Sequence, residues 1–194
     1  SSGKPKGVMI EHFAMMNTLL DVNARYTANK QDKILAISNY SFDLSVYDIF
    51  GLLIAGGTVV LIDEEQSKEP AHWEYLLQKN KITIWNSVPI IAQLLITHLS
   101  NTKNTQALES LRLCLLSGDW IPLNLPRELN RLHPRPENLK IISLGGATEC
   151  SIWSIFYEIQ DILPDWKSIP YGRGMTNQNV YVLDDNLEIC PQWV

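Results

Sequence analysis

Residues 111–119 read Leu-Arg-Leu-Cys-Leu-Leu-Ser-Gly-Asp, an almost unbroken apolar run that ends in a short polar turn. A run this short and this apolar is typical of a strand that is buried on both faces of a sheet. The arrangement returns at Leu139–Leu144, where Gly145-Gly146-Ala147-Thr148-Glu149 follows the apolar residues. A proline-flanked helical segment near Leu125–Leu132 separates the two runs, so they predict neighbouring parallel strands joined through a helix.

Strand-like and helix-like segments alternate along the chain before this pair. We expect strands at Lys6–Ile10, Lys33–Ile37, Thr58–Ile62 and Lys81–Asn86. We expect helices at Glu11–Tyr26, Pro70–Lys79 and Pro89–Leu99, and a mixed apolar segment at Leu44–Ile54. The alternation predicts an α/β fold with a mainly parallel sheet that helices cover on both faces.

The pattern changes after Ser151. Residues 152–159 and 179–187 resemble antiparallel strands, and Asp185-Asn186 is typical of a turn. An antiparallel β portion is therefore expected at the carboxyl-terminal end. In a parallel sheet, ligands gather at the carboxyl ends of the strands, so the segments that follow the strands are the candidates for a site.

Composition excludes several classes of function. The 194-residue chain carries 16 Lys and Arg residues against 21 Asp and Glu residues, a formal net charge of −5, which argues against a nucleic-acid or anionic-membrane surface. No apolar run approaches the roughly 20 residues of a membrane-spanning helix. The three cysteines are widely spaced and odd in number, which favours a reducing compartment. We expect a cytoplasmic protein without nucleic-acid or membrane partners.

Three segments carry side chains suited to ligand chemistry. The opening Ser-Ser-Gly-Lys-Pro-Lys-Gly could wrap phosphates with backbone amides, hydroxyls and a lysine, although such an end is also compatible with a plain terminus. Asp43 lies among apolar neighbours, where it is either a helix N-cap or a buried anchor for a cationic ligand group. Thr148 and Glu149 suit a phosphate oxygen and a hard cation, or belong to an ordinary strand–helix turn. The histidines have no metal-binding spacing, and no Gly-x-Ser-x-Gly hydrolase motif is present.

Taken in order, these segments resemble the core motifs of adenylate-forming, AMP-binding enzymes, and among them the adenylation domains of nonribosomal peptide synthetases. Ser1–Val8 resembles the end of their phosphate-binding loop, and Phe42–Ser45 resembles a substrate-binding motif that begins with Phe-Asp. Leu144–Glu149 resembles the next core motif, usually Asn-x-Tyr-Gly-Pro-Thr-Glu. Pro170–Arg173 and the segment 177–183 resemble the stretch before a later Gly-Glu-Leu motif. The resemblance runs over essentially the whole chain.

The resemblance implies part of the large amino-terminal subdomain, residues 1–194, truncated at both ends and without the carboxyl-terminal lid. It also implies a reaction. The carboxylate of an amino acid attacks the α-phosphate of ATP, pyrophosphate leaves, and the aminoacyl-adenylate passes to the phosphopantetheine thiol of a carrier protein. Condensation or cyclisation domains of the same synthetase would be further partners. Because the lid is missing, we expect the chain alone to have little or no adenylation activity.

The resemblance also implies a substrate pocket. Carried over position by position, its residues are Asp43, Leu44, Tyr47, Asn86, Leu115, Ser117, Leu144, Ile152 and Trp153. This combination resembles the signature of domains that load cysteine, with Asp43 paired to the substrate ammonium. An apolar pocket separates side chains of similar size by only about 1–3 kcal/mol, so serine and small apolar amino acids remain open.

The resemblance assigns the remaining motif residues to ATP. Ser1, Ser2, Gly3 and Lys6 would surround the departing phosphates, Thr148 would contact the α-phosphate and Glu149 would hold Mg²⁺, with Lys6, Thr148 and Glu149 as the catalytic set. Gly118, Asp119, Gly145 and Gly146 would border the adenine, with Ser117 beside them. One departure is Gly145, which stands where many members have an aromatic residue that stacks on adenine.

Two alternatives stay open. An acyl- or aryl-activating AMP-forming ligase is disfavoured by Asp43, because a carboxylate suits an ammonium group. A non-catalytic α/β binding module is disfavoured by the presence of Lys6, Thr148 and Glu149.

Overall fold

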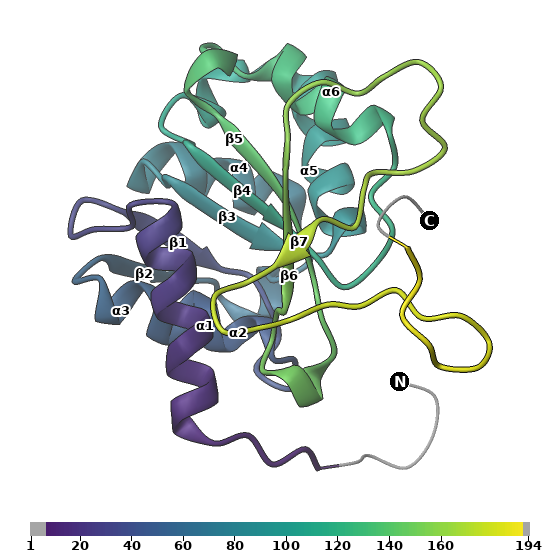
Figure 1. Cartoon of the computed structure of the whole chain (residues 1–194). Helices are drawn as coiled ribbons and strands as arrows, with labels where there is room; N and C mark the ends of the chain where they lie inside the picture. The colour runs from purple at the N-terminus through teal and green to yellow at the C-terminus, as the bar shows by residue number, and fades with distance from the viewer. Residues whose placement is uncertain (1–6, 192–194) are drawn as a thin grey trace.

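The two apolar runs form adjacent strands near the middle of a mixed sheet (Figure 1). The computed structural model describes residues 7–191, and within them seven strands follow the order β2-β1-β3-β4-β5-β6-β7. The first five in this order are parallel: β2 (Thr58–Leu61), β1 (Lys33–Ala36), β3 (Ile84–Ser87), β4 (Leu113–Leu116) and β5 (Lys140–Gly145).

The sheet ends in an antiparallel portion. Strand β6 (Ile155–Ile159) runs antiparallel to β5, and the short β7 (Arg173–Gly174) runs antiparallel to β6. The predicted fold class, a mainly parallel α/β sheet with antiparallel strands at the carboxyl-terminal end, is confirmed.

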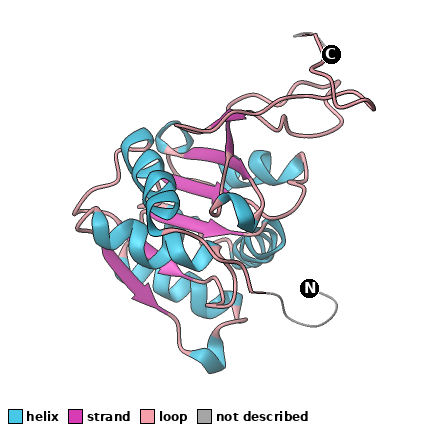
Figure 2. Ribbon diagram, turned by 60° about the horizontal axis from the view of Figure 1, so that its bottom comes forward, coloured by secondary structure: helices cyan, strands magenta, loops and turns pink. Residues whose placement is uncertain are grey.

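Helices cover both faces of the sheet (Figure 2). One face carries α4 (Pro70–Asn80), α5 (Pro89–Thr102) and α6 (Asn124–Leu132), which bury Trp73, Trp85 and Leu95 in one core cluster. Both α4 and α5 begin at a proline, whose fixed φ suits the first helical turn. The other face carries α1 (His12–Arg25) and the segment predicted as mixed, which forms α2 (Leu44–Val46), the π-helical turn η1 (Tyr47–Gly51) and α3 (Leu52–Ile54).

In the described part of the chain, four 3₁₀ turns complete the connections: η2 (Glu64–Gln66), η3 (Thr105–Leu108), η4 (Pro136–Asn138) and η5 (Thr148–Cys150). The last of these directly follows β5 and holds two of the predicted site residues. Among the helices of residues 7–191, none has both the length and the apolar composition needed to cross a membrane.

Two sequence predictions are wrong in detail. Residues 7–10 of the strand predicted at Lys6–Ile10 have no regular structure, and Lys6 lies outside the described residues. Val8 is 39% and Met9 99% exposed, so their apolar side chains have no sheet to pack on. The segment 179–187 forms no ladder within the described chain. It makes one isolated bridge between Leu183 and Ile189, around a turn at the predicted place.

Candidate functional site

Most of the predicted substrate-binding residues lie in one apolar cluster. They come from α2, η1, the ends of β4 and β5, and the loop that follows η5, and all are buried: Leu44, Tyr47, Leu115, Leu144, Ile152 and Trp153. Successive side chains of a strand point to opposite faces, so Leu115 and Leu144 point away from the face that α4, α5 and α6 cover. The Tyr47 and Trp153 rings lie 5.3 Å apart, centre to centre.

Asn86 joins this cluster from the end of β3. Its neighbour two residues earlier, Ile84, belongs to the cluster, so Asn86 points to the same face. The side chain is fully buried, and its Nδ2 donates to Asp48 Oδ1 at 2.7 Å and to the Leu44 carbonyl oxygen at 3.3 Å. Its Oδ1 has no hydrogen-bond partner within residues 7–191. The two donated hydrogen bonds therefore hold the amide in place, and its acceptor oxygen is buried without a partner in this part of the chain.

Two more buried polar atoms share this property. Neither Ser117 Oγ nor Trp153 Nε1 has a hydrogen-bond partner in the described part of the chain. Leaving a buried polar group unpaired costs about 1–3 kcal/mol, and folded proteins rarely do so. Three of the predicted substrate-binding residues thus carry such an atom, and Arg25 Nε, Tyr26 Oη and Ser151 Oγ are the other three within residues 7–191. A polar ligand or a bound water is needed to complete the hydrogen bonding of these atoms.

Asp43 and Thr148 line one hollow. Its volume is about 90 Å³, and Ile152 forms part of its wall, together with Ile10, His12, Met15, Val46 and Ser151. Asp43 occupies the N-cap position of α2, but its half-buried carboxylate makes no capping bond to residues that the structure describes. Among residues 7–191, this leaves the carboxylate available to a ligand group. The hollow brings an anion and a hydroxyl from distant parts of the sequence to one place.

The other predicted ATP residues surround the ends of β4 and β5. Glu149 is exposed on η5, and Gly118 adopts a φ of 84° directly after the buried Ser117. Asp119 is exposed, and its Oδ1 accepts a hydrogen bond from the Trp120 backbone N–H at 2.7 Å. Within residues 7–191, no three His, Cys, Asp or Glu side chains are grouped to hold a metal ion, so Glu149 offers a single carboxylate. The predictions for Ser1, Ser2, Gly3 and Lys6 lie outside the described residues.

Sequence reasoning did not identify Asp48 as part of this region. Asp48 is fully buried and lies four residues after Leu44, a spacing that puts both on one side of a helical turn. Besides the bond from Asn86, its Oδ2 accepts one from the Ser38 backbone N–H at 3.2 Å. Burial raises the pKa of Asp48 to about 7, although the hydrogen bonds from Asn86 and Ser38 offset part of the rise. The sequence feature that could have identified Asp48 is its position as a carboxylate inside the otherwise apolar segment 44–54.

Asp48 predicts an unusual pH dependence of stability. Its pKa is about 7 in the folded protein and 3.8 as the ordinary value, so between these pH values the folded state holds a proton that the unfolded state has released. The contribution of Asp48 to stability should therefore be lost as the pH rises from about 4 to about 7. Urea denaturation at pH 5 and at pH 8 measures the free energy of unfolding of wild type and of Asp48→Asn. From pH 5 to pH 8, wild type should lose on the order of 2 kcal/mol more of this free energy than the variant does. An equal difference between the two proteins at both pH values would contradict the prediction.

The sequence of this chain matches a known enzyme family and several characterised proteins. The sequence pattern of the family described as AMP-binding enzyme matches residues 1–194. Bacitracin synthase 1 of Bacillus licheniformis is 48% identical over 196 residues, and pyochelin synthetase PchF of Pseudomonas aeruginosa is 46% identical over 194 residues. These matches cover 98% and 100% of this chain, which spans only 4% and 10% of the two proteins.

A solved structure shares the fold. The nonribosomal peptide synthetase FmoA3, in its alpha-methyl-L-serine-AMP bound form, matches with a TM-score of 0.91 and 40% identity. The match covers 99% of this chain and 21% of that one. The AMPPNP-bound form of FmoA3 matches with a TM-score of 0.92 and 39% identity, over 99% of this chain and 20% of that one.

Proposed function

This chain belongs to the family of AMP-binding enzymes, and we propose that it forms part of an adenylation domain of a nonribosomal peptide synthetase, in which it activates a small amino acid. The domain would convert ATP and the amino acid to aminoacyl-AMP and pyrophosphate, and then load a carrier-protein thiol. The main support for the proposal is that the predicted substrate residues converge at the strand ends, beside a hollow lined by Asp43 and Thr148. Three of these residues carry a buried polar atom that has no hydrogen-bond partner within residues 7–191.

The shared hollow suggests how one small molecule would be oriented. Asp43 would pair with the α-ammonium group, and Thr148 would lie near the carboxylate that attacks the α-phosphate. Attack forms the carboxyl–phosphate bond and breaks the bond to pyrophosphate. The contribution of the protein is positioning and neutralisation of charge in this transfer. Lys6 and the segment Ser1–Gly3 would assist the departing phosphates, as their motif implies.

The exposed Glu149 fits a magnesium site of the kind that is completed by substrate. Mg²⁺ commonly binds one or two protein carboxylates together with phosphate oxygens and waters, so one carboxylate at the end of β5 is sufficient. Mg²⁺ bound there would neutralise the negative charge of the phosphates. Gly118, Asp119, Gly145 and Gly146 would border the nucleotide on the strand ends, with Thr148 at its α-phosphate.

The side chains in the apolar cluster favour a small substrate with a weakly polar group, and we propose cysteine. Leu44, Leu115 and Ile152 would enclose a small side chain, while the buried Oδ1 of Asn86, which has no hydrogen-bond partner within residues 7–191, would accept a hydrogen bond from a thiol. The bound form of FmoA3 supports a substrate of this size, because that protein holds alpha-methyl-L-serine-AMP.

Amino-acid-dependent ATP–pyrophosphate exchange by the complete adenylation domain tests the proposal. We expect a maximum with cysteine, at least several-fold above serine and valine. A maximum with another amino acid would contradict the cysteine assignment alone. Activity only with acids that lack an α-amine would favour an acyl- or aryl-activating ligase, and absence of ATP binding would favour the non-catalytic module.

A further inference from the structure

The phenol ring of Tyr171 occupies the space in which a side chain at position 145 would lie. A Cβ atom built on Gly145 would be 2.9 Å from Cε2 of Tyr171, 3.2 Å from Cζ and 3.3 Å from the hydroxyl oxygen. Carbon atoms do not approach this closely without displacement, so the ring and a side chain at 145 exclude each other. The glycine at the end of β5 is therefore matched to the tyrosine.

The backbone holds Tyr171 in this position. The next residue, Gly172, has a φ of +106°, and a Cβ atom there would lie 2.0 Å from the carbonyl oxygen of Phe156. Only glycine allows this conformation and this approach to β6. The chain then enters β7, which crosses beside β6 (Figure 1), and Arg173 of β7 pairs with Phe156 of β6. Tyr171 is thus fixed by the sheet on one side.

The Tyr171 ring remains largely open to solvent and lies away from the substrate cluster. Its exposed fraction is 67%, although its edge packs over Gly145. Leu144 points into the substrate cluster, so the next residue, Gly145, points to the opposite face of the sheet. At the end of β5, the Tyr171 ring therefore lies on one face of the sheet and the substrate cluster lies on the other. This point of the chain comes shortly before Thr148 on η5.

We propose that the ring of Tyr171 packs against the adenine of ATP, taking the place of an aromatic side chain at position 145. The proposal rests on the proposed function. An aminoacyl-adenylate joined near Thr148 would have its amino-acid part on the Leu144 side and its nucleotide part on the Gly145 side. Stacking on an aromatic ring suits any base, because every base presents a π-face.

Binding of AMP to the complete adenylation domain tests this assignment. Tyr171→Leu should weaken AMP binding and raise the KM for ATP roughly tenfold, while the KM for cysteine changes less than about twofold. Tyr171→Phe, the matched control, should bind AMP within about twofold of wild type. The double variant Gly145→Tyr/Tyr171→Gly returns an aromatic ring to the same space from the other backbone, and should recover most of the lost affinity.

The outcomes separate this inference from the proposed function. If Tyr171→Leu binds AMP as wild type does, the inference is wrong and the proposed function stands. Equal losses for AMP and cysteine would mean a general structural role and would also overturn it. A wild-type domain that binds no AMP would overturn both. If Tyr171→Leu does not fold, wild type can be photolabelled with 8-azido-ATP instead. Label on the peptide that contains Tyr171 would support the assignment. Label confined to other peptides would refute it.

Discussion

Replacing Arg112 with alanine is expected to lower the free energy of unfolding by about 2–3 kcal/mol, because it leaves the buried carboxylate of Asp32 without its charged partner, while Thr83 and the Asn29 backbone still donate to it. Asp32 has a side-chain exposure of only 3%, and Arg112 binds it through two hydrogen bonds, Nε to Oδ1 at 2.8 Å and Nη2 to Oδ2 at 2.6 Å. Arg112 also donates to the Tyr26 carbonyl oxygen at 2.9 Å, which ties the end of α1 to the sheet.

The pKa of Asp32 agrees with this interpretation. Burial acts to raise it, but the hydrogen bonds from Arg112, Thr83 and the Asn29 backbone outweigh burial and lower the pKa below its ordinary value. The stabilisation is therefore present above the ordinary pKa of 3.8 and is lost as the pH falls through the lower folded value. Asp48 has the opposite dependence, since its pKa is raised.

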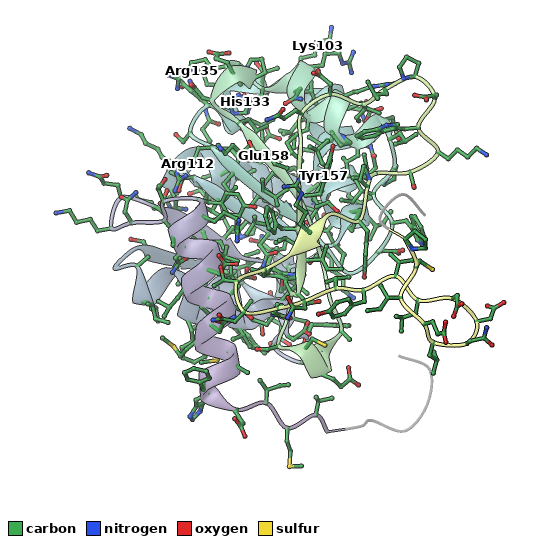
Figure 3. The ribbon with its side chains drawn as sticks, in the orientation of Figure 1. Lys103, Arg112, His133, Arg135, Tyr157 and Glu158 are labelled. Atoms are coloured by element: carbon green, nitrogen blue, oxygen red, sulfur yellow. The ribbon has the colours of Figure 1, made fainter. Side chains whose placement is uncertain are left out.

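Urea denaturation at pH 7 of wild type, Arg112→Ala and the double variant Asp32→Asn/Arg112→Ala measures the effect. The double variant should be more stable than Arg112→Ala, because it removes the unpaired charge. Figure 3 places Arg112 near the end of α1, away from the η5 turn, so ligand binding by the folded variants should persist. A loss below 1 kcal/mol in Arg112→Ala would show that water reaches Asp32.

The sheet could be predicted from sequence because buried parallel strands leave a local signal. The apolar runs that became β4 and β5 are short, continuous and followed by glycine, so neither needed knowledge of its neighbours. The strand expected at Lys6–Ile10 contains a shorter apolar stretch, Val8-Met9-Ile10, and within residues 7–10 no neighbouring strand pairs with it, so an extended conformation gains nothing there. Local composition describes what a segment can form, and pairing decides whether it does.

The polar contacts of the candidate site could not be predicted in the same way. The bond between Asp48 and Asn86 joins residues 38 positions apart, and both side chains are buried only once η1 packs on the sheet. The match between Gly145 and Tyr171 also depends on how the segment before β7 lies against β6. A sequence motif identifies the residues at a strand end. Tertiary packing determines which partners those residues contact and hydrogen-bond.

In the complete adenylation domain, Asp43→Ala is expected to lower kcat/KM for cysteine in ATP–pyrophosphate exchange by roughly 10- to 100-fold. A charge-assisted contact to an ammonium group is worth about 1.5–3 kcal/mol, and each 1.4 kcal/mol corresponds to a factor of ten. Asp43 makes no capping bond within the described chain, so its loss should affect the ligand more than the fold. AMP affinity should change less than about twofold. The exposed Asp165 provides a matched control, since Asp165→Ala removes the same charge outside the candidate site.

A substrate analogue makes this test specific for the ammonium group. The acid 3-mercaptopropionate has the carboxylate and thiol of cysteine but no α-amine, so it cannot pair with Asp43. Wild type should prefer cysteine to this analogue strongly, and Asp43→Ala should lose most of that preference because the partner of the ammonium is gone. If Asp43→Ala keeps the full preference, the ammonium is recognised elsewhere and the assignment of the hollow beside Thr148 is wrong. If both proteins use the analogue as well as cysteine, the domain does not read the amine at all, and an acyl-activating ligase becomes the better description.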